Sequence, residues 1–428
     1  MKAFLELQLA VLLAMLFIIA GCGGTSAKTT AIAAERGNMQ SDNNKNQSLT
    51  DSHYILEPST SPPSGLTPDE VPMFIVFGDD DNGYSGLDSD GNLKKGSGGT
   101  AWLVDIFKDI KNPIGNSNPA TFDGAPAHFS MMGLTEYITW EKRVECKRAW
   151  RMAYESGHEI GNHTATHPHG DKASIEDWTR EINTATSDMT KPWNSQNPDD
   201  LNGGIGLKKD EIIGFRSPYL QYNENLFKVL EQNGFKYDCS IEEGYDDKFD
   251  GRNFNWPYTL HNGTPANSTI DKHPSIVEIP VYPFMVPPDE ECEKYGVQKG
   301  FRLSLKEREK GPQFQKDHDH DYIHMEDGRI RGLDYDLWQE YNMTANEFTA
   351  TLKYTLDQRL KSNRAPMTVC MHTDFYVNKP WDEDYGVESD VARQAAIQDF
   401  LDYASSIPQV RIVSNRELLS WLLNPSKL

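Results

Sequence analysis

Fully apolar runs and amphipathic stretches alternate along most of this chain. Met73–Phe77 is a continuous apolar run, which is typical of a strand buried on both faces. Residues 100–111 then carry apolar side chains at helical spacing, and residues 142–156 form an amphipathic helix pattern that stops at Gly157. Similar patterns predict further strands at 127–132, 158–162, 211–216, 276–280, 367–372 and 410–413, and further helices at 175–189, 223–233, 344–362, 390–405 and from 414.

This regular alternation of strands and helices predicts an α/β protein with a parallel sheet. Because about seven such units follow one another, we expect a single distorted (β/α) barrel of about seven strands rather than an open sheet. The barrel domain is assigned to residues 69–424. Residues 283–335 are charged and interrupt the alternation, so they are interpreted as a loop insertion over one face.

The N-terminal residues are typical of an export signal. Lys2 precedes an apolar run at residues 9–19, which is too short for a stable membrane span, so residues 1–22 are interpreted as a signal peptide. The end of this segment, Ile19–Cys22, resembles a bacterial lipobox, and that resemblance implies that Cys22 carries a lipid. We therefore expect a protein of the cell envelope, lipid-anchored to a membrane and outward-facing or periplasmic. An ordinary secretory signal or an uncleaved anchor remains the alternative.

Residues 23–68 are rich in Ser, Thr, Asn, Ala and Gly and have no hydrophobic period, which predicts a flexible tether. The whole chain has 428 residues and a net charge of −22, which argues against a nucleic-acid partner. We expect a monomer. In an exported protein the four cysteines after Cys22 permit two disulfides, in a pairing that the sequence leaves open; they are Cys146, Cys239, Cys292 and Cys370.

Polar residues capable of chemistry follow the ends of four predicted strands. Parallel strands present their carboxyl ends at one rim of a barrel, so we expect these residues to lie close together. Two of them, His163 and His167, form a pair that suits a divalent metal if a carboxylate completes the set, although most such pairs alone bind nothing. The candidates are Asp79–Asp81, His163 and His167, Arg216 and Tyr219, and His372.

In these segments the chain resembles the polysaccharide deacetylase family, also called NodB-like or carbohydrate esterase family four. The resemblance runs in order from about residue 71 to residue 415 and has four matching motifs. They are Gly78–Asn82 for the Asp-Asp pair, His163–His167 for His-Ser/Thr-x-x-His, Arg216–Tyr219 for Arg-x-Pro-Tyr, and Cys370–His372 for the histidine that ends a strand. Four motifs in one order are far more specific than any one alone.

Two motifs depart from the family pattern. The usual Phe before the Asp pair is missing, so the pair is either Asp80-Asp81, which Asn82-Gly83 favours, or Asp79-Asp80. The fourth motif is weak: Tyr237–Ser240 occupies its place. There Asp238 either supports the general acid or is a turn residue.

Hydrolysis of an acetamide needs an activated water, a polarised carbonyl and a proton for the leaving amine. The resemblance implies a divalent metal, with zinc preferred, bound by Asp81, His163 and His167. It further implies that Asp80 is the general base, held and kept ionised by Arg216. The backbone N–H of Tyr219 would stabilise the oxyanion together with the metal, and His372 would act as general acid. A catalytic histidine usually needs an orienting partner on its other ring nitrogen.

The expected activity is removal of N-acetyl groups from N-acetylglucosamine polymers. Chitin or its oligomers come first, because Phe254–Tyr258 and Tyr237–Ser240 look like loops of the chitin-deacetylase branch. The alternatives are an O-acetyl esterase acting on a xylan-like glycan, a peptidoglycan deacetylase, and a glycan-binding lipoprotein that has lost catalysis.

Two further groups of residues are weaker candidates. Histidines at 318, 320 and 324 would suit a second metal, but a solvated loop is the preferred interpretation. We expect one or two of the following aromatic residues to stack on sugar rings and the others to belong to the core: Trp256, Tyr258, Trp338, Tyr376 and Trp381.

Overall fold

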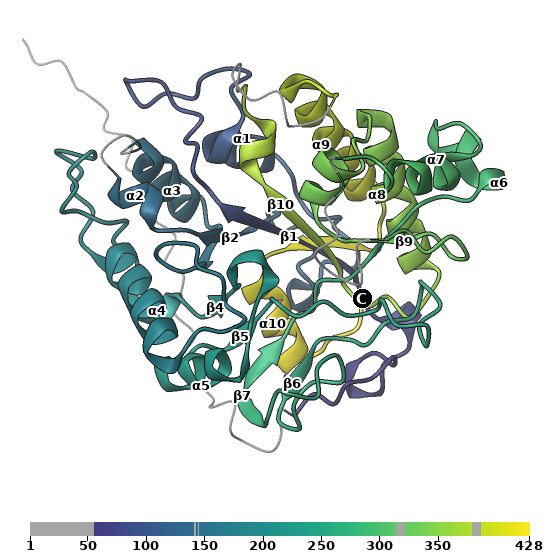
Figure 1. Ribbon diagram of the computed structural model, residues 1–428, viewed down its shortest axis with the longest axis horizontal. Coiled ribbons are helices and arrows are strands. Elements are labelled where there is room, and N and C mark those ends of the chain that lie inside the picture. Colours follow the sequence, from purple (N-terminus) through teal and green to yellow (C-terminus); the bar gives the residue numbers. More distant parts are fainter. Residues whose placement is uncertain (1–54, 141–142, 144, 313, 315–321, 379–386) are drawn as a thin grey trace, which may run out of the picture. The chain divides into compact units, whose positions relative to one another are not determined.

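One curved sheet of nine strands lies at the centre of the computed structural model, which describes residues 55–140, 143, 145–312, 314, 322–378 and 387–428 (Figure 1). The strand order is β10-β1-β2-β3-β4-β5-β7-β6, and β11 also pairs with β1. All pairs are parallel except β6 with β7. The bounds are β1 Met73–Asp81, β2 Ser130–Gly133, β3 Glu159–Asn162, β4 Gly214–Phe215, β5 Tyr237–Asp238, β6 Tyr258–Leu260, β7 His273–Glu278, β10 Met367–His372 and β11 Val410–Val413.

The sheet curves until the chain after β7 reaches β10 on the other side. The backbone N–H of Tyr282 donates to the Thr368 hydroxyl at 3.2 Å, and that hydroxyl donates to the carbonyl of Pro280 at 3.2 Å. These side-chain hydrogen bonds, rather than a strand ladder, join the two ends. The α/β fold with a distorted barrel is therefore confirmed, with nine strands instead of about seven. The strands missed by the sequence pattern include β5 and β6, whose two and three residues are too few to show a period.

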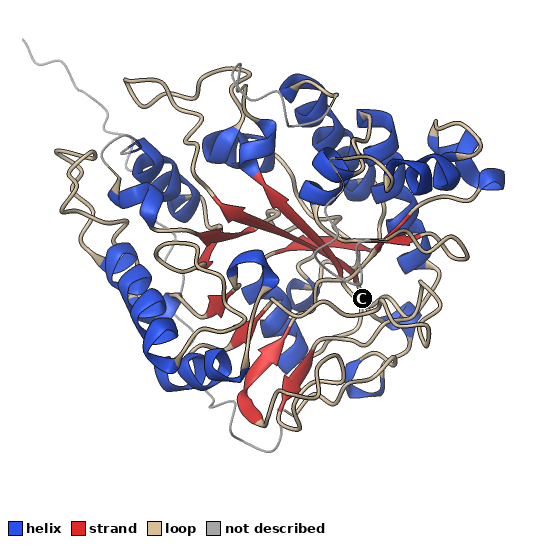
Figure 2. Ribbon diagram, in the orientation of Figure 1, coloured by secondary structure: helices blue, strands red, loops and turns tan. Residues whose placement is uncertain are grey.

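Helices surround the sheet on the outside (Figure 2). Their interior faces bury large apolar side chains such as Trp150 and Trp178. Capping boxes at Ser174, Thr344 and Ser414 begin three of them and stabilise their first turns. The helices are α1 Gly99–Phe107, α2 Glu136–Thr139, α3 Glu145–Glu155, α4 Ile175–Thr190, α5 Glu224–Asn233, α8 Ala345–Leu360, α9 Asp390–Ser405 and α10 Asn415–Leu423.

The segment 283–335, interpreted from its charge as a loop insertion, contains regular structure. Strands β8 (Phe284–Met285) and β9 (Arg329–Ile330) form a small antiparallel sheet, and α6 (Asp289–Cys292) and α7 (Phe301–Arg308) lie between them. Apolar residues of the segment such as Phe284, Phe301 and Leu305 are buried, and the N–H of Met285 donates to Thr355 on α8. Its charged residues conceal these short elements from a periodicity analysis.

The domain begins earlier than residue 69, the start expected from composition. The N–H of Leu56 donates to the Thr259 hydroxyl, the N–H of Thr259 donates back to Leu56, and the N–H of Trp256 donates to Ser59. Residues 55–68, expected to be the end of the tether, therefore pack against the domain. The expected signal peptide at 1–22, the lipidation site Cys22, tether residues 23–54, and His318, His320 and Trp381 lie outside the described residues.

Within the described ranges, no helix combines the length and the apolar character needed to span a membrane. The four cysteines that permitted two disulfides are all buried and free. They lie on separate elements, namely α3, the end of β5, α6 and β10. Burial raises the pKa of the Cys370 thiol to about 12.

Candidate active site

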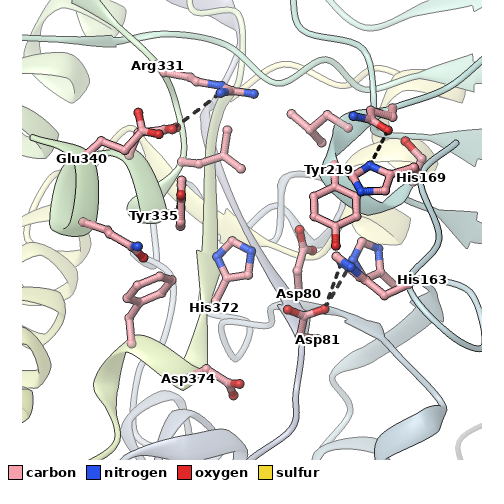
Figure 3. Close-up of a pocket in the computed structure, with 18 of the residues that line it drawn as sticks. Asp80, Asp81, His163, His169, Tyr219, Arg331, Tyr335, Glu340, His372 and Asp374 are labelled. Carbon is pink, nitrogen blue, oxygen red and sulfur yellow. Dashed lines mark hydrogen bonds and ion pairs between the residues drawn. The ribbon is translucent and has the colours of Figure 1, made fainter. Parts of the chain in front are cut away.

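Residues from the carboxyl ends of several parallel strands line one cavity of about 610 Å³ (Figure 3). The structure brings Asp80, Asp81, His163, His167, Tyr219 and His372 to its wall. Arg216 is not part of the wall but lies behind it, paired with the Asp80 carboxylate. The predicted candidates thus converge on one rim of the barrel.

Asp81 and the two histidines face one another at the end of β1. Asp81 Oδ1 is 3.6 Å from His163 Nε2 and 3.5 Å from His167 Nε2, and one ligand atom from each residue lies within 4.8 Å of the others. Asp81 and Asn82 both have left-handed backbone conformations, with φ of 68° and 63°. These conformations are uncommon for residues other than glycine and turn the chain sharply at the end of β1.

A backbone carbonyl orients His163, and burial favours the neutral form of both histidines. His163 Nδ1 is 2.8 Å from the carbonyl of Arg216, so Nδ1 carries the proton and Nε2 keeps a lone pair toward Asp81. Burial lowers the pKa of His163 to about 3 and that of His167 to about 3. Two neutral imidazoles and a carboxylate beside an open cavity fit a divalent metal such as zinc with room for further ligands. Among the described residues, this is the single cluster of three or more potential ligands.

Helix α4 fixes the loop that carries the histidines. Glu181 on this helix accepts hydrogen bonds from the backbone N–H groups of Ala165 and Thr166 and from the Thr166 hydroxyl. The loop needs such support because Thr164 and His167 have φ of 72° and 57°.

Asp80 forms a buried ion pair with Arg216. Arg216 Nη1 donates to Asp80 Oδ1 at 2.8 Å, and Arg216 Nε donates to the carbonyl of Cys239 at 3.0 Å. Burial disfavours the charge of Arg216, but the adjacent Asp80 carboxylate outweighs it and raises the pKa of Arg216. The guanidinium also explains Gly78, because a Cβ there would come within 2.8 Å of Arg216 Nη1.

His372 is paired with Asp334, a residue that the motifs did not identify. His372 Nδ1 donates to Asp334 Oδ1 at 2.8 Å, and the backbone N–H of His372 donates to Asp334 Oδ2 at 2.9 Å. Burial disfavours the imidazolium, but Asp334 and the nearby Asp80 outweigh it and raise the pKa of His372 to about 10. Asp334 is itself buried.

Asp238, which sequence reasoning suggested as a support for the general acid, does not contact His372. Its carboxylate accepts hydrogen bonds from the N–H and the hydroxyl of Ser240, and burial raises the pKa of Asp238 to about 6. Asp334 lies near the end of the segment interpreted as an insertion. The signal that identifies it is spatial, since Leu333 bridges Cys370 two residues before His372.

Tyr219 lies at the cavity mouth, where 48% of its surface is exposed. Its ring stacks on His169 at a centroid distance of 4.3 Å and meets the edge of His167 at 4.5 Å. Ser217 anchors this loop, because its N–H donates to the Ser240 hydroxyl at 2.8 Å. The Ser217 hydroxyl is buried in the cavity wall and has no hydrogen-bond partner among the residues that the structure describes.

The opposite wall comes from the turn after β9 (Figure 3). A π-helical turn at Asp336–Glu340 contributes polar side chains to the cavity, and Arg331 donates to Glu242 at 3.0 Å. The aromatic residues of the cavity are Tyr137, Tyr219, Tyr335 and Phe375. By contrast, four of the five aromatic residues considered for sugar stacking are buried in the core: Trp256, Tyr258, Trp338 and Tyr376.

A family model described as polysaccharide deacetylase matches residues 124–237. This segment contains the motifs His163–His167 and Arg216–Tyr219 and ends before His372. No curated protein matches the chain.

Three of the solved structures to which the chain is similar are the following. A candidate polysaccharide deacetylase from Mycobacterium smegmatis is 15% identical with a TM-score of 0.47, over 87% of this chain and 98% of that one. PuuE allantoinase is 14% identical with a TM-score of 0.40, over 85% and 95%. A family 4 acetyl xylan esterase from Clostridium thermocellum, in complex with cobalt, is 15% identical with a TM-score of 0.24, over 42% and 64%.

Proposed function

We propose that this protein is a metal-dependent hydrolase of the polysaccharide deacetylase family that removes N-acetyl groups from glycans containing N-acetylglucosamine. One observation carries the proposal. A potential metal triad, a carboxylate paired with an arginine, and a histidine paired with a buried aspartate all converge on one cavity. Acyl transfer to water needs these three components together.

A divalent metal bound by Asp81, His163 and His167, zinc in our proposal, would polarise the acetyl carbonyl and lower the pKa of a bound water. Asp80 accepts the proton of the attacking water. Arg216 holds Asp80 in place through its 2.8 Å hydrogen bond.

Departure of the amine requires a proton, and His372 is placed to supply it. Its Nδ1 is held by Asp334, which fixes the ring and leaves Nε2 for the leaving group. The backbone N–H of Tyr219 is our candidate for hydrogen bonding to the developing oxyanion, because its loop borders the metal triad.

Chitin oligomers are the first substrate that we propose, with peptidoglycan and O-acetylated xylan as the alternatives. The loop Phe254–Tyr258, which suggested chitin, contributes no side chain to the cavity. Specificity therefore depends on the residues of the cavity itself, and substrate comparison has to decide it.

Acetate release from chitooligosaccharides, peptidoglycan and acetylxylan tests the proposal, with and without a chelator. We expect release that the chelator abolishes and added zinc restores, and we expect loss of release in His163→Ala. Chelator-insensitive release would refute the metal-dependent mechanism. If the parent protein binds glycan but releases no acetate from any substrate, the alternative of a glycan-binding lipoprotein that has lost catalysis would be favoured instead.

We also propose that the protein is exported and anchored through a lipid on Cys22, so that its partners are a membrane and an acetylated glycan. Incorporation of labelled fatty acid tests this, with Cys22→Ser as the control. Equal labelling of both proteins would refute the assignment of Cys22.

A further inference from the structure

Asp79 is the one member of the Asp79–Asp81 run to which the proposed chemistry gives no role. Side chains alternate along β1, so Asp79 shares its face with Ile75 and Phe77. Both of those residues belong to the apolar core beneath the helices, and Phe77 packs against Phe107 on α1. Asp79 is fully buried there. A carboxylate in this position is costly unless its oxygens are hydrogen-bonded.

Each oxygen of Asp79 contacts a different strand end. Oδ2 accepts a hydrogen bond from Asn82 Nδ2 at 2.5 Å, within the left-handed turn that contains Asp81. Oδ1 accepts a hydrogen bond from the backbone N–H of Thr373 at 2.8 Å, directly after His372 on β10.

The strand register shows what this bridge adds. In the ladder between β1 and β10, Asp80 is opposite His372, and this is the last pair. Beyond it, the chains of Asp81–Asn82 and Thr373 continue without a ladder between them. The Asp79 carboxylate joins the two chains at the point where they leave the sheet.

We propose that Asp79 is a positioning residue that fixes the metal-ligand turn and the general-acid segment relative to each other. The inference rests on the proposed function for the roles of Asp81 and His372. A link of this kind would set the separation between the ligand carboxylate and the acid imidazole, so that both fit the carbonyl and the nitrogen of the same amide group.

Two measurements distinguish the contact of Asp79 with Asn82 in the metal-ligand turn from its contact with Thr373 after His372. Zinc affinity, measured by chelator competition, reports the placement of Asp81 and needs no turnover. The ratio of kcat for an N-acetyl substrate to kcat for 4-nitrophenyl acetate reports His372, because the nitrophenolate leaves without a proton whereas an amine does not.

The variants remove the contacts selectively. Asp79→Leu removes both acceptors at similar volume, and we expect it to weaken zinc binding about 10-fold and to lower the kcat ratio at least about 10-fold. Asn82→Gly tolerates the positive φ and cuts only the turn contact, so zinc affinity should fall while the ratio stays at the parent value. It also tests the proposal if Asp79→Leu does not fold.

Asp79→Asn is the conservative variant. It keeps an acceptor for the N–H of Thr373, and rotation of the Asn82 amide restores the second contact, so both readouts should stay near the parent values. Glu159→Gln is the control for general destabilisation. Glu159 is a buried carboxylate at the start of β3, bonded to Ser130 and Tyr237, and its loss should move neither readout.

The proposal is overturned if folded Asp79→Leu changes neither readout or only one, or if Asn82→Gly lowers the ratio. It is also overturned if Glu159→Gln reproduces the effects of Asp79→Leu. Zinc binding without acetate release by the parent would refute the proposed function and with it the catalytic half of this inference. If the parent binds zinc but releases no acetate, an unchanged zinc affinity in Asp79→Leu would refute the part of the inference that concerns the turn containing Asp81.

Discussion

Individual residues around the cavity adopt backbone conformations that most side chains avoid. Six of them have positive φ although none is glycine; they are Asp81, Asn82, Thr164, His167, Tyr219 and Leu220. Each such residue costs about 1–3 kcal/mol and persists only where the surrounding contacts impose it. Sequence motifs gave a chemical role to three of the six, Asp81, His167 and Tyr219, without showing this geometry, because φ depends on hydrogen bonds such as those that Glu181 and Ser240 accept.

Replacing Asp334 tests the pairing of the general acid. The pKa of His372 is about 10, above the ordinary value, so the acid form is present below that pH and is lost as the pH rises through it. In Asp334→Asn the pKa of His372 falls, so the alkaline limit of deacetylation should move to lower pH. At pH 8 kcat should fall roughly 10²- to 10³-fold. A bound cation lowers the pKa of His372 in the parent and in the variant alike. The measurement therefore compares the pH profile of the metal-loaded parent with that of metal-loaded Asp334→Asn.

Ser217→Ala tests whether the partnerless hydroxyl contacts the glycan. A buried polar group that bonds only to substrate contributes about 1 kcal/mol, so kcat/KM for a chitooligosaccharide should fall about 5- to 10-fold. Hydrolysis of 4-nitrophenyl acetate should be unchanged, since that substrate has no sugar hydroxyl. Equal loss on both substrates would mean that the variant disturbs the loop instead.

At the scale of elements, long strands and helices were predictable and short ones were not. The apolar runs of β1 and β10 and the caps of α4 and α8 have clear sequence signals. Strands β8 and β9 have two residues each. Asp334 follows β9 in the chain, and the bridge between Leu333 and Cys370 places it beside β10. Asp334, the site residue that the motifs did not identify, therefore lies in a segment whose structure depends on tertiary contacts rather than on a local sequence pattern.

Helix α4 provides a test of how an element supports the metal loop. Glu181→Leu removes the acceptor for three hydrogen bonds of residues 165–166, so zinc affinity should fall about 10-fold with both histidines intact. Glu176→Leu, an exposed change on the same helix, should leave it unaltered. Isothermal titration calorimetry measures both. Equal affinity of the two variants would show that the loop holds its shape without α4.

At the scale of the whole molecule, the parallel α/β architecture followed from the order of the elements, but the way the barrel closes did not. Closure depends on tertiary contacts of β10, which include the hydrogen bonds of the Thr368 hydroxyl and the Leu333–Cys370 bridge, and no pattern distinguishes Thr368 from its neighbours. The early start of the packed domain, with Leu56 bonded to Thr259, likewise depends on residues about 200 positions apart.

Metal binding should stabilise the entire domain, since Asp81, His163 and His167 are brought together only in the folded chain. Zinc at 100 times its dissociation constant should add about 2.7 kcal/mol to the free energy of unfolding. Thermal denaturation with zinc and with chelator measures this, and His163→Ala should lose the difference. A Tm that does not respond to zinc in the parent would contradict binding at this site.

The hydrogen bonds of Thr368 with Pro280 and Tyr282 have a consequence for how the enzyme would lose activity in denaturant. The proposed acid His372 ends β10, the strand that makes these contacts, whereas the proposed metal ligands lie at the ends of β1 and β3, which are ladder-paired on both sides. Hydrogen exchange should be faster at the N–H of Tyr282, which is bonded to a side chain, than at the N–H groups of the ladder between β1 and β10. As the denaturant concentration rises, deacetylation should therefore be lost before zinc binding, which leaves a protein that binds zinc but has no activity.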